Sequence, residues 1–70
     1  MPPAPIVVHS ASPTGGRRVT ARGQILGLAH SDADVVEFLR RAGIEGAEEL
    51  LDEPRWVEWR GGRAHEYGAA

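Results

Sequence analysis

The chain has 70 residues, 41% of them apolar, a formal net charge of −2 and no cysteine. This length fits one domain, and without cysteine there is no disulfide framework, thiolate nucleophile or cysteine-ligated zinc. The longest apolar runs fall far short of the roughly 20 residues of a membrane-spanning helix, and the start of the chain lacks the basic and apolar parts of a secretory signal. We therefore expect a cytoplasmic protein that does not enter a membrane.

Charge is segregated along the chain. Residues 1–30 contain three arginines and no acidic residue, whereas residues 31–54 contain eight acidic residues against Arg40 and Arg41. If the fold places these two segments in different layers, the domain has one basic and one acidic side.

The first part of the chain is predicted to form a hairpin of two strands. Residues 6–9 are a short β-branched run, and residues 12–16 are dense in turn formers. Residues 17–29 alternate polar and apolar side chains and predict one longer strand. The alternation fails near its end, and Gly23 or Gly27 is expected to mark a bulge or bend there.

A helix is predicted to follow at Ser31, which is a preferred N-cap residue with Asp34 three places on in the manner of a capping box. Gly43 can take the left-handed position that ends a helix, with Ile44 packing back onto it. Four apolar residues recur at helical spacing and form a single stripe that we expect to be buried, namely Val35, Phe38, Leu39 and Ala42.

The last part of the chain, from Trp56 to Tyr67, is predicted to be a β-hairpin with a two-residue turn at Gly61 and Gly62. Glycine supplies the positive φ angles that such a turn needs. The inward face would then carry Val57, Trp59, Ala64 and Glu66. The outward face would carry three cross-strand pairs, Trp56–Tyr67, Glu58–His65 and Arg60–Arg63.

Together these elements predict a small two-layer α+β domain over residues 6–67. The expected order is β-β-α-(short α)-β-β, with the short helix over residues 47–52 and antiparallel hairpins covered by one main helix. The helical stripe should pack on the sheet face that bears Val57 and Trp59. Residues 1–5 and 68–70 are expected to be disordered.

The outward face of the C-terminal hairpin is the predicted contact surface. Tryptophan, tyrosine and arginine are the residue types enriched where proteins bind each other. A short chain with a marginal core also gains stability from association. We expect a non-catalytic regulatory or interaction module, homodimeric, whose contact is with a second copy or another protein partner. The contact residues are Trp56, Glu58, Arg60, Arg63, His65 and Tyr67, with Arg18 and Arg22 nearby.

The alternative function is a nucleic-acid-associated regulator that uses the same surface, because arginines and aromatic rings also bind single strands. Against it, the sequence pI of 5.8 lacks the basic character typical of such domains, and no known RNA-binding motif is present.

No catalytic residue, metal ligand or cofactor-binding residue is predicted. The sequence offers no nucleophile with a base and an orienting group. Its three histidines lack the close spacing of metal ligands, and capping explains the acidic residues near His30. The glycine–arginine loop at residues 15–18 leads into a strand, whereas phosphate loops lead into a helix.

Overall fold

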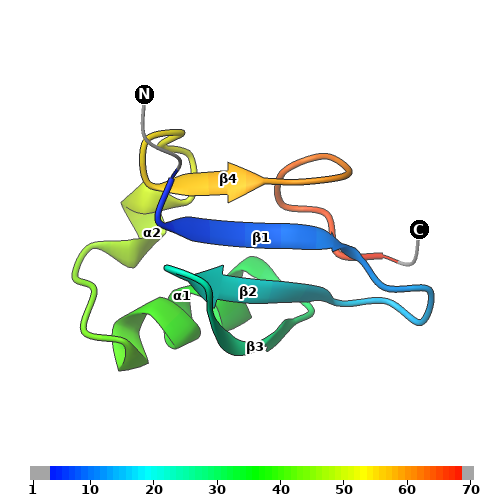
Figure 1. The fold of residues 1–70 in the computed structure, drawn as a ribbon, viewed down its shortest axis with the longest axis horizontal. Helices are drawn as coiled ribbons and strands as arrows, with labels where there is room; N and C mark the ends of the chain where they lie inside the picture. Colours follow the sequence, from blue (N-terminus) through cyan, green and yellow to red (C-terminus); the bar gives the residue numbers. More distant parts are fainter. Residues whose placement is uncertain (1–3, 69–70) are drawn as a thin grey trace.

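The computed structural model describes residues 4–68 and has four strands and two helices. The elements are β1 (Ile6–Ala11), β2 (Arg17–Ala21), β3 (Gln24–Ala29), α1 (Asp32–Arg41), α2 (Ala47–Leu50) and β4 (Val57–Trp59). The strands form one sheet in the order β3-β2-β1-β4, and both helices lie on one side of it (Figure 1). The chain is therefore the two-layer α+β domain that the sequence predicts.

The core lies between the sheet and the helices. Alternate residues of the strands point toward the helices, because side chains alternate across a strand. The buried cluster contains Ile6, Val8, Val19, Ala29 and Val57 from the sheet, and Val35, Leu39, Ala47 and Leu51 from the helices and the residue after α2. The predicted packing of the helical stripe on the face that bears Val57 and Trp59 is confirmed for Val35 and Leu39, and Phe38 packs against the same cluster.

Helix α1 begins and ends as the sequence predicts. The Asp34 N–H donates to the Ser31 hydroxyl at 3.3 Å, which caps the first turn. At the other end Gly43 has a φ of 85°, and the Ile44 N–H donates to the Leu39 carbonyl at 3.0 Å in a Schellman motif. The predicted burial of one residue of the stripe is wrong, because Ala42 is the C-cap residue and is exposed.

The long strand predicted over residues 17–29 is divided into β2 and β3. Arg22 and Gly23 have φ angles of 52° and 84°, which form a tight primed turn and pair the two strands antiparallel. The register then shifts, since Val19 pairs with Gly27 while the next residue of β2 pairs with Ile25. The expected bend at Gly23 is thus a complete turn, and a bulge follows it within β3.

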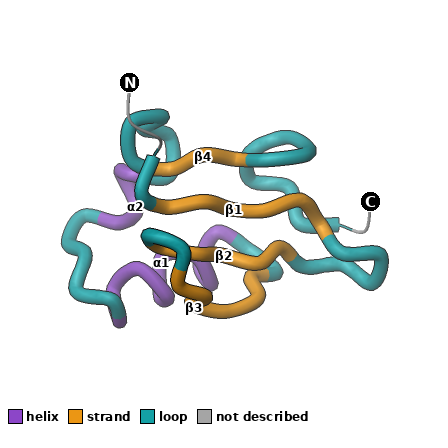
Figure 2. Tube along the Cα trace, viewed as in Figure 1, coloured by secondary structure: helices purple, strands orange, loops and turns teal. Residues whose placement is uncertain are grey.

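The predicted C-terminal hairpin is wrong in its second strand. β4 pairs with β1, in parallel, and no second strand follows it within residues 4–68 (Figure 2). A connection through helices carries the chain back across the sheet, so the strand that follows it runs parallel to its neighbour. The cross-strand pairs expected across Gly61 and Gly62 are absent from the described part of the chain. Gly61 instead approaches β1, where an added Cβ would lie 2.5 Å from the Ser10 Cβ.

The second helix is shorter than expected, spanning Ala47–Leu50. The expected disorder at the ends of the chain falls mainly on residues 1–3 and 69–70, which lie outside the described residues. Among the described residues, neither helix has the length and apolar character needed to cross a membrane.

Candidate interaction surface

The helices cover one face of the sheet and leave the other open. Paired residues share a face, so the register of β1 with its neighbours assigns Val7, Thr20 and Glu58 to this open face. The pairing of β2 with β3 adds Arg18 with Leu28, and Ile25 opposite Thr20. The open face is accordingly made of Val7, His9, Arg18, Thr20, Ile25, Leu28 and Glu58, with Arg22 and Arg60 at the ends of β2 and β4.

Two large apolar side chains of the open face are exposed to solvent. Ile25 is 63% exposed and Leu28 is 49% exposed, and both belong to β3. A groove of about 470 Å³ lies on the same face, where Val7, His9 and Thr20 line it together with Pro5, Arg22 and Arg60. The face thus combines apolar side chains with a hollow bordered by positive charge.

The charge of the open face is predominantly positive. Arg60 donates to the Glu58 carboxylate at 2.5 Å, whereas Arg18 and Arg22 form no ion pair within the described residues. Burial lowers the pKa of His9, and the charges of Arg60 and Arg18 lower it further. The His9 imidazole bonds the Thr20 hydroxyl at 2.9 Å. Four of the predicted contact residues, Arg18, Arg22, Glu58 and Arg60, therefore lie on or beside one face.

The other predicted contact residues are elsewhere, so the single patch expected from the sequence is divided. Trp56 is 46% exposed and lies at one end of the sheet, beside a groove of about 380 Å³ that Leu26 and Ile44 also line. His65 and Tyr67 lie on the helical side, where they contact acidic residues. The division follows from the missing strand, because without a hairpin these side chains share no sheet face with Glu58.

Arg17 holds the C-terminal segment, residues 60–68, against the end of the sheet. Its side chain is only 1% exposed. The guanidinium donates to the carbonyls of Arg60, Arg63 and Glu66 at 2.6, 2.9 and 3.0 Å, and Nε donates to the His9 carbonyl at 2.7 Å. Buried charges require hydrogen-bond partners, and here backbone carbonyls of the segment supply them. The Arg60 and Arg63 carbonyls are the ones that would pair across the predicted two-residue turn, so these bonds compete with a second hairpin strand.

His65 and Tyr67 attach the same segment to the helical layer. The two ring nitrogens of His65 lie 2.6 Å from an Asp32 carboxylate oxygen and 2.5 Å from an Asp52 oxygen, and the Tyr67 hydroxyl donates to Asp32 at 2.5 Å. Hydrogen bonds that the Asp52 and Asp32 carboxylates accept from the ring raise the pKa of His65, and burial raises the pKa of Tyr67. Since both nitrogens are engaged by carboxylates, His65 has no free nitrogen with which to act as a general base.

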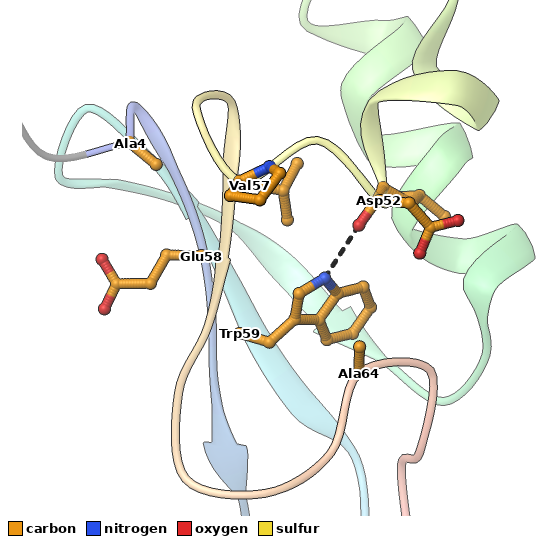
Figure 3. A pocket seen from close by; sticks show the side chains of 8 residues that line it. Ala4, Asp52, Val57, Glu58, Trp59 and Ala64 are labelled. Carbon is orange, nitrogen blue, oxygen red and sulfur yellow. Dashed lines mark hydrogen bonds between the residues drawn. The ribbon is translucent and has the colours of Figure 1, made fainter.

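Trp59 lies beneath this segment and joins it to the core. Its indole N–H donates to the Leu51 carbonyl at 2.9 Å (Figure 3). The ring is 5.3 Å from the Arg17 guanidinium carbon and 6.0 Å from the Tyr67 ring. Figure 3 also shows Ala64 beside the indole and Glu58 directed away from it, as expected for neighbours on opposite strand faces. The prediction that Trp59 is inward is confirmed, and Trp56 is exposed.

Sequence reasoning missed the burial of Arg17 and the exposure of Ile25 and Leu28. The burial of Arg17 could have been found in the sequence, because Arg17 is two residues from the core residue Val19 and so shares its strand face. The exposure of Ile25 and Leu28 could not be found from simple alternation, since the bulge in β3 places residues three apart on one face.

The described residues contain no group of histidine, cysteine and acidic side chains able to hold a metal ion. Comparison with protein-family models, curated proteins and solved structures finds no match for this chain, so its function is argued from geometry and chemistry.

Proposed function

We propose that this protein is a non-catalytic interaction module that binds a protein partner through the open face. One observation carries the proposal. Ile25 and Leu28 are exposed on a sheet face that no described element covers, beside Arg18 and Arg22, which have no ion-pair partner among the described residues. Small soluble proteins rarely expose apolar patches bordered by polar residues except where they bind something.

The partner that fits this face is a protein segment that carries both acidic and apolar side chains. Carboxylates would meet Arg18 and Arg22, for which bidentate hydrogen bonding is available. Apolar side chains would cover Leu28 and Ile25 and remove them from water. A purely basic or purely polar segment would leave one half of the surface unmatched.

A nucleic-acid partner is the second candidate, and the arginines of the open face favour it. Single-strand binding also relies on aromatic rings on which bases stack. The rings predicted to stack on bases are not on this face, because Trp56 lies at one end of the sheet and His65 and Tyr67 are bonded to Asp32 on the helical side. An acidic protein segment therefore fits the face better.

The non-catalytic part of the proposal concerns the cluster of His65, Asp32, Asp52 and Tyr67 among the described residues. Both ring nitrogens of His65 and the Tyr67 hydroxyl are bonded to carboxylates. The imidazole and the phenol therefore serve to fix the C-terminal segment and are not free to act as a base or a nucleophile. For a cysteine-free chain of this kind we propose a cytoplasmic location.

Selection from a displayed library of random peptides tests the proposed partner chemistry. We expect the immobilised protein to enrich peptides that contain Asp or Glu next to apolar residues. Binding of a selected peptide should be lost in Arg18→Glu and retained in Arg40→Glu, a matched charge reversal on α1. Peptides that are enriched in basic residues, or whose binding responds equally to both variants, would contradict the proposal.

Fluorescence anisotropy with labelled single-stranded RNA separates the second candidate. A nucleic-acid binder loses affinity steeply as salt rises, through counterion release. If RNA binds more tightly than every selected peptide and Arg18→Glu abolishes that binding, the protein-partner proposal is overturned in favour of nucleic acid.

A further inference from the structure

The β3 edge of the sheet has none of the usual protection against pairing. Sheet edges expose unpaired N–H and C=O groups, and natural proteins protect them with charge, proline or very short strands. β3 spans Gln24–Ala29 and contains no charged residue and no proline, and it pairs with β2 on one side only. This edge therefore invites another strand.

The facing pattern of β3 makes it complementary to itself. Gln24 and Ala29 pair with Ala21 and Arg17 of β2, residues of the helical face, whereas Ile25 and Leu28 belong to the open face. The bulge between them leaves Leu26 and Gly27 together in the middle, both on the helical face, since Leu26 packs against the core and Gly27 lies against Phe38 of α1. Read in either direction, the order of faces along the strand is the same. A simple alternation over six residues would not have this symmetry.

We propose that a second copy of this chain pairs antiparallel with β3 about a two-fold axis between Leu26 and Gly27. This inference deepens the proposed function by naming one partner, and it rests on the exposed strand on which that proposal also depends. The register places Ile25 of each copy opposite Leu28 of the other. Both exposed apolar side chains then gain cross-strand apolar neighbours, which stabilise antiparallel pairs, and closed two-fold pairing uses one surface on both copies.

The charged residues near the paired strands also favour this register. Continuing the pairing beyond the strand brings the Arg22–Gly23 turn of one copy toward His30 and Ser31 of the other, next to the acidic start of α1 at Asp32. Arg18 is on β2, one strand away from the axis, so the arginines of the two copies do not face each other. The pairing joins two open faces into one continuous sheet and leaves the arginines available to another partner.

Disulfide formation between two single-cysteine variants tests the register directly, because the native chain has no cysteine. Ile25→Cys mixed with Leu28→Cys should form a mixed disulfide rapidly, since directly opposite residues have Cα separations within the range of about 4.4–6.8 Å that disulfides require. Neither variant alone should form one, because like positions are offset by three residues, roughly 10 Å along the strand. Glu48→Cys, on α2, replaces Leu28→Cys as the matched control.

Equal cross-linking in all mixtures, or cross-linking only within each variant alone, would overturn the register. Absence of the mixed disulfide would do the same.

Solution mass by light scattering tests the pairing without cysteines. We expect a dimer for the native chain, a monomer for Ile25→Lys, and a dimer for both Glu48→Lys and Arg18→Glu. A native monomer at every accessible concentration overturns the self-pairing but not the peptide-binding proposal, which Arg18→Glu tests separately. Loss of peptide binding in Arg18→Glu with the dimer intact shows that the two surfaces are distinct, and Ile25→Lys remaining dimeric would place the dimer elsewhere.

Discussion

The two edges of the sheet are built in opposite ways. β4 is three residues long, carries Glu58 and is followed by Arg60, and its inward residue Trp59 is engaged by the C-terminal segment. β3 is six residues long, carries no charge and directs Ile25 and Leu28 to solvent. Short, charged strands are poor templates for pairing, and long uncharged ones are good templates. The fold is therefore closed by internal contacts at one edge and available for association at the other.

Trp59→Ala is expected to have the largest effect, because it removes the side chain on which the β4 edge is built. Loss of a large packed ring costs about 3–5 kcal/mol, and this one also donates to Leu51 and lies over Arg17. Ile25→Ala at the β3 edge should change the monomer by less than about 0.5 kcal/mol. Urea denaturation at concentrations where the protein is monomeric measures both.

Trp56→Ala is the control for tryptophan itself, since Trp56 is exposed and should alter stability little. If Trp59→Ala and Ile25→Ala cost the same free energy, the two edges do not differ as described.

Arg17→Met compared with Arg18→Met is expected to show the next largest difference. Arg17 donates charged hydrogen bonds to carbonyls of the C-terminal segment, and such bonds contribute roughly 1.5–3 kcal/mol each. Some of these carbonyls can return to water, so we expect a loss of about 3 kcal/mol. Arg18 is exposed on the opposite face, and its replacement should cost less than about 0.5 kcal/mol.

Hydrogen exchange adds a local readout, in which Arg17→Met should raise exchange at the Gly16 N–H that bonds the Tyr67 carbonyl. Unchanged exchange there, with unchanged stability, would mean that Arg17 does not hold the segment.

The sequence was sufficient for the elements whose signals are local. Ser31 and Gly43 set the ends of α1 through backbone capping, which depends on a few neighbouring residues. The sequence of strands, then two helices, then a returning strand followed from periodicity, although the number of strands on each side of the helices did not. These features give the α+β class without any knowledge of long-range contacts.

The surface was harder to predict because it depends on pairing partners far apart in sequence. Gly61 and Gly62 have the composition of a hairpin turn, yet Arg17, more than forty residues earlier, bonds the carbonyls that the hairpin would use. Arg22 and Gly23 form such a turn instead, although arginine rarely adopts a positive φ. One face nevertheless holds four of the predicted contact residues, namely Arg18, Arg22, Glu58 and Arg60. The alternation of side chains along a strand depends only on neighbouring residues, and β4 directs its side chains to the faces that the sequence predicted.

Gly27→Ala is expected to have an intermediate effect and shows how β3 differs between its two sides. An added Cβ would lie 2.6 Å from the Phe38 Cζ, so the ring must move. Overpacking of this kind costs about 1–3 kcal/mol. The cost should fall in a Phe38→Leu background, which frees space, whereas Leu28→Ala on the open side should cost less than about 0.5 kcal/mol in the monomer. Urea denaturation measures the free energy of unfolding of each variant. If Gly27→Ala lowers it equally in the native and Phe38→Leu backgrounds, the Phe38 ring does not fill the space beside Gly27.

The smallest expected effect concerns pH and contrasts the acidic environment of His65 with the basic environment of His9. The pKa of His65 is raised above its ordinary value of 6.5 by Asp52 and Asp32. Folding therefore favours its protonated form. The stability that it contributes is complete below pH 6.5 and is lost as the pH rises through the higher pKa of the folded state.

His9 responds in the opposite direction. Its pKa is lowered below 6.5 by burial and by the charges of Arg60 and Arg18, so folding favours its neutral form. Its contribution is present above pH 6.5 and is lost as the pH falls through the lower pKa of the folded state. The two dependences act on opposite sides of pH 6.5, so in the native chain the pair together gives a maximum of stability near that pH.

Each histidine variant should therefore keep one of the two declines and lose the other. In His9→Asn, stability should decline as the pH rises above 6.5, because only the His65 contribution remains of the pair. In His65→Asn, stability should decline as the pH falls below 6.5. Chemical denaturation of both variants and the native chain across this range gives the slopes, whose signs matter more than their small size, since exposed pairs are weakened by solvent and salt. Slopes of the same sign in the two variants would mean that the two histidines do not lie in opposite electrostatic environments, and the contrast between the acidic and basic sides of the domain would fail with them.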